Sequence, residues 1–137
     1  MRRDLHSNIL STPALNPQAI ASSTTTTGAT IDCKGYGVLE FLLQSATITD
    51  GTYTPGIFVG NASNMSDEVA INVADLIGTY ALSTFISTDD NVCKRIGVKL
   101  GTFRYCRLKI VSTGVTTGGT LAAQAVLATP AVAAVAG

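Results

Sequence analysis

Basic side chains are concentrated in one short part of this 137-residue chain. Six of the nine lysines and arginines lie between residues 94 and 109, and no charged residue follows Lys109. Two aromatic residues, Phe103 and Tyr105, are interleaved with them. Cationic groups at this density could hold an anionic partner, either an acidic protein surface or phosphate groups, and the rings could stack on bases. The chemistry that this segment suggests is binding.

Side chains that could catalyse a reaction have no evident partners. The single histidine, His6, lies in a polar segment, and no serine, cysteine or carboxylate has a general base at a recognisable spacing. The pair Asp89-Asp90 occupies a turn sequence, where neighbouring side chains diverge, so we interpret it as turn-forming. The sequence therefore predicts no catalytic residue and no enzyme activity.

Metal and cofactor sites are equally unsupported. The three cysteines, Cys33, Cys93 and Cys106, have no C-x-x-C spacing and no neighbouring histidine, so we predict free and mostly buried thiols. The glycine-rich stretch 114–119 lacks the Lys-Ser/Thr of a phosphate-binding loop and is interpreted as a turn. We expect no metal ion and no cofactor.

Composition indicates that solvent contacts little of this chain. Only 13% of its residues are charged and 46% are hydrophobic, whereas about 25% are charged in typical globular domains. The formal net charge is zero, but every acid lies at or before Asp90 and most bases lie after it. Zero net charge argues against nucleic acid as the main partner, and the segregated charges indicate a surface that another molecule covers. These features are typical of an assembly component.

The ends of the chain carry no recognisable targeting signal. Arg2 and Arg3 are followed by polar residues and prolines without an apolar run, so we expect synthesis in a host cytoplasm. The apolar stretch 121–136 is shorter than the roughly 20 residues that a membrane helix needs, and Gln124 and Pro130 interrupt it. We therefore expect no membrane partner.

One all-β domain preceded by an extended arm is the predicted organisation. Residues 1–28 are rich in Ser, Thr and Pro, and we interpret them as an N-terminal arm that is either loose or ordered against a neighbouring subunit. Residues 29–137 show short β-branched and aromatic runs separated by turn residues, and they end in an apolar strand or tail. This pattern predicts a single antiparallel β-sandwich of jelly-roll or immunoglobulin-like type.

Alternation places one strand in the core. Within residues 38–44, Leu39, Phe41 and Leu43 share one face, so we expect that face to fill the core and the other to be available to a partner. Residues 79–86 are a second predicted strand. The stretch 68–77 fits a short helical turn or a strand equally well.

A first hairpin is predicted around Asp50-Gly51. These two residues separate the β-prone runs 46–49 and 52–54, and Asp-Gly tolerates the positive φ angles of a type I′ turn. Pro55 predicts that the returning strand is bent or at an edge, because proline cannot donate a ladder hydrogen bond.

The basic segment 94–109 is predicted to form a second hairpin. A three-residue loop at 101–103 would place Ile96 opposite Leu108 and create one apolar face. On the other face Arg95 would lie against Lys109, a like-charge pair that costs about 1 kcal/mol or less. The offsetting acids would be Asp89 and Asp90 or acids on another chain. The residues predicted to contact a partner are Arg95, Lys99, Tyr105, Arg107 and Lys109.

Several short motifs resemble a group of virion proteins. They are Asp50-Gly51-Thr52-Tyr53-Thr54, Asp75-Leu76 with Gly78-Thr79-Tyr80, Thr88-Asp89-Asp90-Asn91, Arg95-Ile96-Gly97 and Phe103-Arg104-Tyr105-Cys106-Arg107-Leu108. Over residues 29–127 the chain resembles small structural proteins of tailed-bacteriophage virions, which are typically encoded among head genes and regarded as head decoration, or cement, proteins. The resemblance implies a β-sandwich that binds the outside of the capsid lattice, often as a symmetric oligomer, and strengthens it. The stretch 121–136 departs from that pattern.

The expected function is that of a non-enzymatic capsid decoration protein located on the phage head. Its expected partners are the major capsid protein and further copies of itself, with a trimer as one candidate. Two alternatives stay open. One is a tail or adhesin-type β-sandwich module that binds a receptor or glycan, and the other is a nucleic-acid-binding protein that uses the 94–109 hairpin.

Overall fold

The computed structural model of the chain describes residues 4–130. These residues form ten strands and three short 3₁₀ helices. The strands are β1 (Ile9–Ile20), β2 (Thr25–Thr27), β3 (Ile31–Asp32), β4 (Tyr36–Ile48), β5 (Thr52–Gly60), β6 (Val69–Ala70), β7 (Leu76–Ile77), β8 (Cys93–Lys99), β9 (Tyr105–Thr113) and β10 (Gly119–Pro130). The 3₁₀ helices are η1 (His6–Asn8), η2 (Val73–Asp75) and η3 (Ala81–Ser83).

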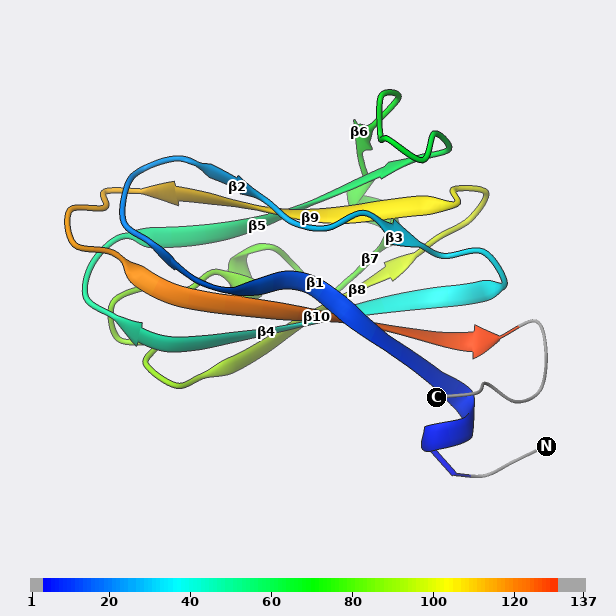
Figure 1. The fold of residues 1–137 in the computed structure, drawn as a ribbon, viewed down its shortest axis with the longest axis horizontal. Helices are drawn as coiled ribbons and strands as arrows, with labels where there is room; N and C mark the ends of the chain where they lie inside the picture. The colour runs from blue at the N-terminus through cyan, green and yellow to red at the C-terminus, as the bar shows by residue number, and fades with distance from the viewer. Residues whose placement is uncertain (1–3, 131–137) are drawn as a thin grey trace.

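The strands form two antiparallel sheets that pack as a sandwich (Figure 1). Sheet A has the strand order β1-β10-β4-β8-β7, and sheet B has the order β2-β9-β5-β6, with β3 also paired to β9. In Figure 1 the strands β2, β9 and β5 form one layer, and β1, β10 and β4 lie in the other. The predicted all-β sandwich is therefore confirmed.

The core lies between the two sheets and follows the alternation of the long strands. In β4 the residues Leu39, Phe41 and Leu43 are buried, as predicted, while their neighbours on the other face are partly or fully exposed. Strand β9 buries Cys106, Leu108 and Ile110 in the same way from the opposite sheet. Fully burying one such aliphatic or aromatic side chain contributes about 1.5 to 3 kcal/mol, so this interior is the main source of stability.

Both predicted hairpins are wrong, because in each case the two strands belong to different sheets. Strand β4 pairs with β10 and β8, whereas β5 pairs with β9 and β6. Strand β8 pairs with β4 and β7, whereas β9 pairs with β5, β2 and β3. Each connection crosses the sandwich. Alternating strands satisfy the same burial pattern whether they lie side by side or face each other across a core.

One carboxylate holds the β4–β5 connection in its crossing path. Asp50 accepts hydrogen bonds from the backbone N–H groups of Thr116, Thr117 and Gly118 at 2.9 to 3.2 Å. These donors lie in the glycine-rich turn between β9 and β10, and they lower the pKa of Asp50. Gly51 supplies a φ of +92° beside it. The Asp-Gly pair thus ties two connections together at one end of the sandwich, and the stretch 114–119 is a turn, as interpreted.

The predicted strand over residues 79–86 is also wrong. Most of this stretch is η3 and its flanks, and Phe85 alone forms an isolated bridge, with Tyr53. The Thr79 hydroxyl accepts a hydrogen bond from the Leu82 backbone N–H, and the Thr84 hydroxyl donates to the Tyr80 carbonyl. Such local bonds between side chains and backbone compete with strand pairing, which the β propensity of the residues does not anticipate.

Part of the segment predicted as an arm belongs to the chain's own sheets. Strand β1 is extended, as expected, and pairs with β10 at the edge of sheet A, with register shifts near Pro13. Strand β2 pairs with β9 in sheet B. The threonines favour strand addition, and here the strands to which they add belong to the same chain. That residues 1–28 act as an arm in an assembly stays a prediction.

The apolar stretch near the C-terminus forms a central strand as far as it is described. Strand β10 lies between β1 and β4 and buries Leu121, Ala123, Ala125 and Leu127. The remainder of the predicted tail, 131–137, lies outside the described residues. Among residues 4–130 there is no helix long and apolar enough to cross a membrane.

The structure also settles the surroundings of Pro55 and the form of the stretch 68–77. Pro55 pairs with β9 on one side, and β6 pairs with β5 only at Phe58 and Val59, so Pro55 occupies an edge position, as predicted. The undecided stretch 68–77 holds the short strands β6 and β7 with η2 between them.

Candidate interaction surfaces

The five residues predicted to contact a partner are divided between two opposite surfaces. We call the outward-facing side chains of β1, β10, β4, β8 and β7 the sheet A face, and those of β9, β5 and β2 the sheet B face. Arg95 and Lys99 are exposed on β8 and belong to the sheet A face. Tyr105, Arg107 and Lys109 are half-buried on β9 and belong to the sheet B face. The structure therefore does not bring the five residues together.

On the sheet B face the basic side chains are paired within the chain. The Arg107 guanidinium lies 2.7 Å from one oxygen of Glu68, and the Lys109 ammonium lies 2.6 Å from the other. The Lys109 ammonium also lies 4.4 Å from the centre of the Phe58 ring. Hydrogen bonds from Lys109, and then from Arg107, lower the pKa of Glu68. Glu68 neutralises much of the basic charge of this face.

Two further basic residues near the ends of β8 and β9 are also paired. Arg104 forms two hydrogen bonds to the Asp32 carboxylate, at 3.0 and 2.9 Å, and its guanidinium lies 5.0 Å from the centre of the Tyr105 ring. Lys94 lies 3.1 Å from Asp89. Asp89 and Asp90 also accept backbone hydrogen bonds, from Ile86 and Ile48 respectively, which agrees with their interpretation as turn formers. Intramolecular pairing thus accounts for these charges.

On the sheet A face the basic side chains are not paired. Within residues 4–130, Arg95 and Lys99 make no ion pair within 4.0 Å, and no side-chain hydrogen bond is found for either. Glu40 on β4 is diagonal to Arg95 in the register of the two strands. Burial raises the pKa of Glu40, and the charge of Arg95 offsets that rise in part.

The rest of the sheet A face is apolar or uncharged. Leu42 is 40% exposed and Ile77 is 50% exposed, and Val38, Val126 and Ala128 are partly exposed beside them. Val38 and Leu42 belong to the outward face of β4, which is the face of residues 38–44 that was predicted to be available to a partner. An apolar face with few charges is typical of surface that a partner covers.

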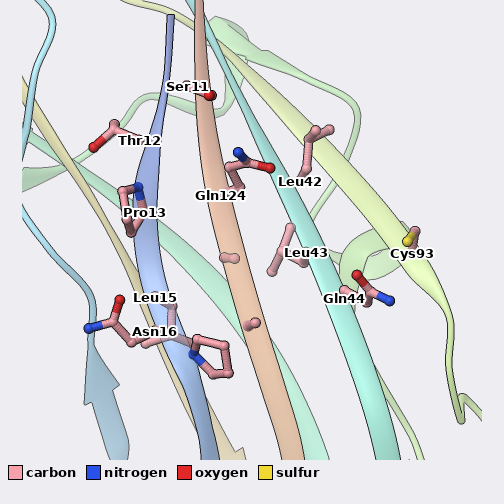
Figure 2. A pocket seen from close by; sticks show the side chains of 13 residues that line it. Ser11, Thr12, Pro13, Leu15, Asn16, Leu42, Leu43, Gln44, Cys93 and Gln124 are labelled. Atoms are coloured by element: carbon pink, nitrogen blue, oxygen red, sulfur yellow. The ribbon is translucent and has the colours of Figure 1, made fainter.

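A groove runs across one end of this face, between β1 and β8. It has a volume of about 440 Å³, and its floor is formed by β10 and β4. Figure 2 shows Pro13 and Asn16 on the β1 side, Gln124 on β10, Leu42 and Gln44 on β4, and Cys93 on β8. The small residues Ala122 and Ala123 of β10 leave the hollow between these longer side chains. Among the residues that the structure describes, no charged side chain lines the groove.

The cysteines have no evident catalytic setting. Cys33 and Cys106 are buried free thiols and Cys93 is an exposed one, which agrees with the prediction of mostly buried thiols. Burial raises the pKa of Cys33 to about 12, and it raises that of Cys106 as well, so both are neutral thiols. Among the described residues no group of His, Cys, Asp or Glu could hold a metal ion.

Two functional acids were not recognised in the sequence. Glu68 precedes Arg107 by 39 residues, and nothing in the local sequence indicates that the two will meet. Glu40 lies in the predicted core strand, where its outward position was recognised but its closeness to Arg95 was not. The sequence feature that could have indicated the role of Glu40 is that it is the single acid among residues 38–44, which are mostly apolar.

Comparisons with known proteins identify the fold. No protein-family model matches the sequence, and no curated protein is similar to it. Among solved structures, the chain is similar to the SPBc2 prophage-derived protein YomS, with a TM-score of 0.50 and 11% identity over 88% of this chain and 92% of that protein. At this identity the similarity shows a shared fold.

Two further solved structures have lower TM-scores. One is from the Gx strain of infectious bursal disease virus, with a TM-score of 0.48 and 10% identity over 87% of this chain and 31% of that one. The other is from Bacillus endospore appendages, with a TM-score of 0.43 and 11% identity over 89% of each chain.

Proposed function

We propose that this chain is a non-enzymatic structural component of a tailed-phage virion, and specifically a head decoration protein that binds the capsid lattice. The observation that carries this proposal is the sheet A face, which combines exposed apolar side chains, an uncharged groove and two basic residues without partners. Surface of this kind is costly on a free monomer and is stabilised when another protein covers it.

Two further observations support a phage origin. The sequence motifs over residues 29–127 resemble those of tailed-phage virion proteins, and a prophage-derived protein shares the fold. A decoration protein needs no catalysis, because it stabilises a shell by adding buried contact area between neighbouring subunits. The expected partners are the major capsid protein and further copies of this chain, with a trimer as one candidate for the oligomer.

The nucleic-acid alternative loses the surface on which it was based. It required one hairpin with basic and aromatic side chains on a single face, and that hairpin does not form. The basic residues instead lie on opposite faces, and Arg107 and Lys109 are paired with Glu68. In the described part of the chain no aromatic side chain lines the groove on the sheet A face, which weakens the glycan alternative, since ligand pockets are commonly lined by aromatic residues.

Co-sedimentation with capsid shells tests the proposal. Shells of the phage of origin that lack this protein are mixed with the purified chain, and the bound copies per shell are counted. We expect saturable binding at a fixed stoichiometry. Absence of binding to intact shells would refute the decoration role and favour a tail or receptor-binding component.

Two double variants make the test specific for a surface. Arg95→Ala with Lys99→Ala changes the sheet A face, and Arg107→Ala with Lys109→Ala is the matched change on the sheet B face. We expect fewer copies of the first variant to bind per shell. The second variant, assayed under conditions in which it is folded, should bind as many copies per shell as the unmodified chain. Equal occupancy for both variants would show that the basic residues do not contribute to shell binding.

A further inference from the structure

The three charged residues of the sheet A face form an incomplete set. Glu40 is partly buried, and its carboxylate lies over Gly97, since a Cβ added at Gly97 would stand 2.4 Å from a Glu40 oxygen. Arg95 and Lys99 are exposed on either side of Gly97 along β8. Within residues 4–130, Glu40 forms no ion pair and no side-chain hydrogen bond, and the same is true of the two basic side chains. One acid and two bases therefore share a face without direct pairing.

Three acids elsewhere in the described chain differ from Glu40 in having a basic partner. Glu68, Asp32 and Asp89 each pair with a basic side chain at 3.1 Å or less. A carboxylate that is partly desolvated without an ion-pair partner is destabilising, because burial disfavours its charged form. The cost is offset when a cation from another molecule reaches the same site.

The surroundings restrict what that molecule can be. The charged set is bordered by Val38, Leu42, Ile77 and Val126, so a partner must present apolar side chains together with a base for Glu40 and an acid for Arg95. The same face of a second copy presents all of these groups. In a two-fold contact each residue pair occurs twice, so one Glu40 and one Arg95 per chain satisfy both copies.

We propose that the sheet A face binds the sheet A face of a second copy of this chain about a two-fold axis, with Glu40 of each copy paired with Arg95 of the other. Glu40 and Arg95 occupy one diagonal of a four-residue square on β4 and β8, and Leu42 and Gly97 occupy the other. A two-fold axis that exchanges Glu40 and Arg95 runs close to Leu42, so the leucines of the two copies meet near the axis. Lys99 lies beside this contact as a second cation.

This inference rests on the part of the proposed function that makes the chain a homo-oligomer, and it replaces the trimer with a two-fold contact. It assigns the sheet A face to a second copy of the chain, so the dimer would contact a shell through its other surfaces. A sheet-to-sheet contact also accounts for the shape of the face, because β10 contributes the small side chains Ala122 and Ala128 that let a second sheet approach. Facing sheets pack about 10 Å apart when side chains interdigitate.

A charge exchange tests the pairing. The dissociation constant of the dimer is measured by analytical ultracentrifugation over a range of concentrations for the unmodified chain, Glu40→Arg, Arg95→Glu and the double variant. Each single variant places like charges together twice per dimer, so we expect a dissociation constant at least roughly tenfold higher. In the double variant the opposite charges face each other again, and we expect a value within about threefold of the unmodified chain.

The control is Val111→Glu on the sheet B face, where the valine is 44% exposed. It should leave the dissociation constant unchanged. If thermal melting shows that Glu40→Arg does not fold, Arg95→Glu and Leu42→Asp decide the question, since both change exposed side chains and both should weaken the dimer.

Any of four results would overturn the inference. These are an unmodified chain that stays monomeric at the highest concentration, single variants that dimerise normally, a double variant that dimerises no better than the single ones, and a trimer without charge-exchange rescue. The shell assay separates this failure from that of the proposed function. If the chain forms dimers that do not bind shells, the decoration role is refuted and the two-fold contact is retained. If the chain stays monomeric and binds shells, the two-fold contact is refuted and the decoration role is retained.

Discussion

The two outer faces of this sandwich carry basic side chains on β8 and β9, which follow one another in the chain, yet the faces differ in what those side chains contact. On the sheet B face Glu68 lies between Arg107 and Lys109 and pairs with both. On the sheet A face Glu40 lies near Arg95 without an ion pair, and exposed apolar residues surround the two. Charges satisfied within the chain contribute to stability, and charges left without partners are available for binding.

The largest expected effect is a difference in stability between the two basic double variants. Replacing Arg107 and Lys109 by alanine leaves the half-buried Glu68 carboxylate without its partners, and we expect a loss of about 1 to 2 kcal/mol in the free energy of unfolding. Replacing Arg95 and Lys99 by alanine should change that free energy by less than about 0.5 kcal/mol. Urea unfolding of both variants, at a protein concentration below the dissociation constant of the dimer, measures the difference. A similar loss in both would show that the faces do not differ.

The two glutamates should respond in opposite directions to loss of charge. Glu68→Gln weakens two charge-assisted hydrogen bonds, so we expect it to destabilise the monomer by about 1 kcal/mol. Glu40→Gln removes a desolvated charge without breaking an ion pair, so we expect the monomer to be as stable as before or slightly more stable. Chemical denaturation near neutral pH tests both. Destabilisation by Glu40→Gln would mean that Glu40 already has its partner within the chain.

The contributions of Glu68 and Glu40 to stability should also depend on pH in opposite ways. The pKa of Glu68 is lowered below its ordinary value of 4.5, so its contribution is complete above that pH and is lost as the pH falls through the folded-state value. The pKa of Glu40 is raised, so its cost is present above the folded-state value and disappears as the pH falls below 4.5.

We therefore expect the stability gap between the unmodified chain and Glu68→Gln to close in acid. Any gain from Glu40→Gln should also vanish in acid, although it has the opposite sign at neutral pH. Unfolding free energies of the three proteins, compared between about pH 7 and pH 3, decide this. A gap for Glu68→Gln that does not depend on pH would show that packing, and not charge, stabilises the site.

The smallest expected effect is that of Gly97→Ala. The added Cβ would meet the Glu40 carboxylate, which is the flexible end of a side chain, and would stand 3.1 Å from Ile77 Cβ. We expect a change of less than about 0.5 kcal/mol in unfolding free energy, because the carboxylate can move aside. Displacing Glu40 should nevertheless raise the dimer dissociation constant by a few fold, which ultracentrifugation can measure. An unchanged constant would show that the position of Glu40 over Gly97 is not important for binding.

Burial along individual strands was predictable from the sequence. Alternation in residues 38–44 predicts which side chains face the core, and the apolar residues of the 94–109 segment, among them Ile96 and Leu108, are buried as the pattern requires. Strand pairing was not predictable in the same way. The two segments that looked like hairpins connect different sheets, because Asp-Gly and Gly-Thr turns fit a crossing as well as a tight return.

The candidate site was predictable only in part for the same reason. Arg95, Lys99, Arg107 and Lys109 were recognised as a group by closeness in sequence, and the crossing connection after β8 separates them onto opposite faces. The acid that pairs with Arg107 and Lys109 comes from a loop far away in the chain. Ion pairs between distant residues depend on strand order, and no local pattern contains that order.

The sequence alone determined that this protein is a β-sandwich with a mostly uncharged surface, since alternation and composition depend only on which residue follows which. The tertiary structure decided which strands are neighbours, which bases meet an acid and which face is left apolar and unpaired. The physical reason is that burial rewards an apolar side chain wherever it reaches the core, whereas an ion pair requires two particular residues to lie within a few ångströms of each other.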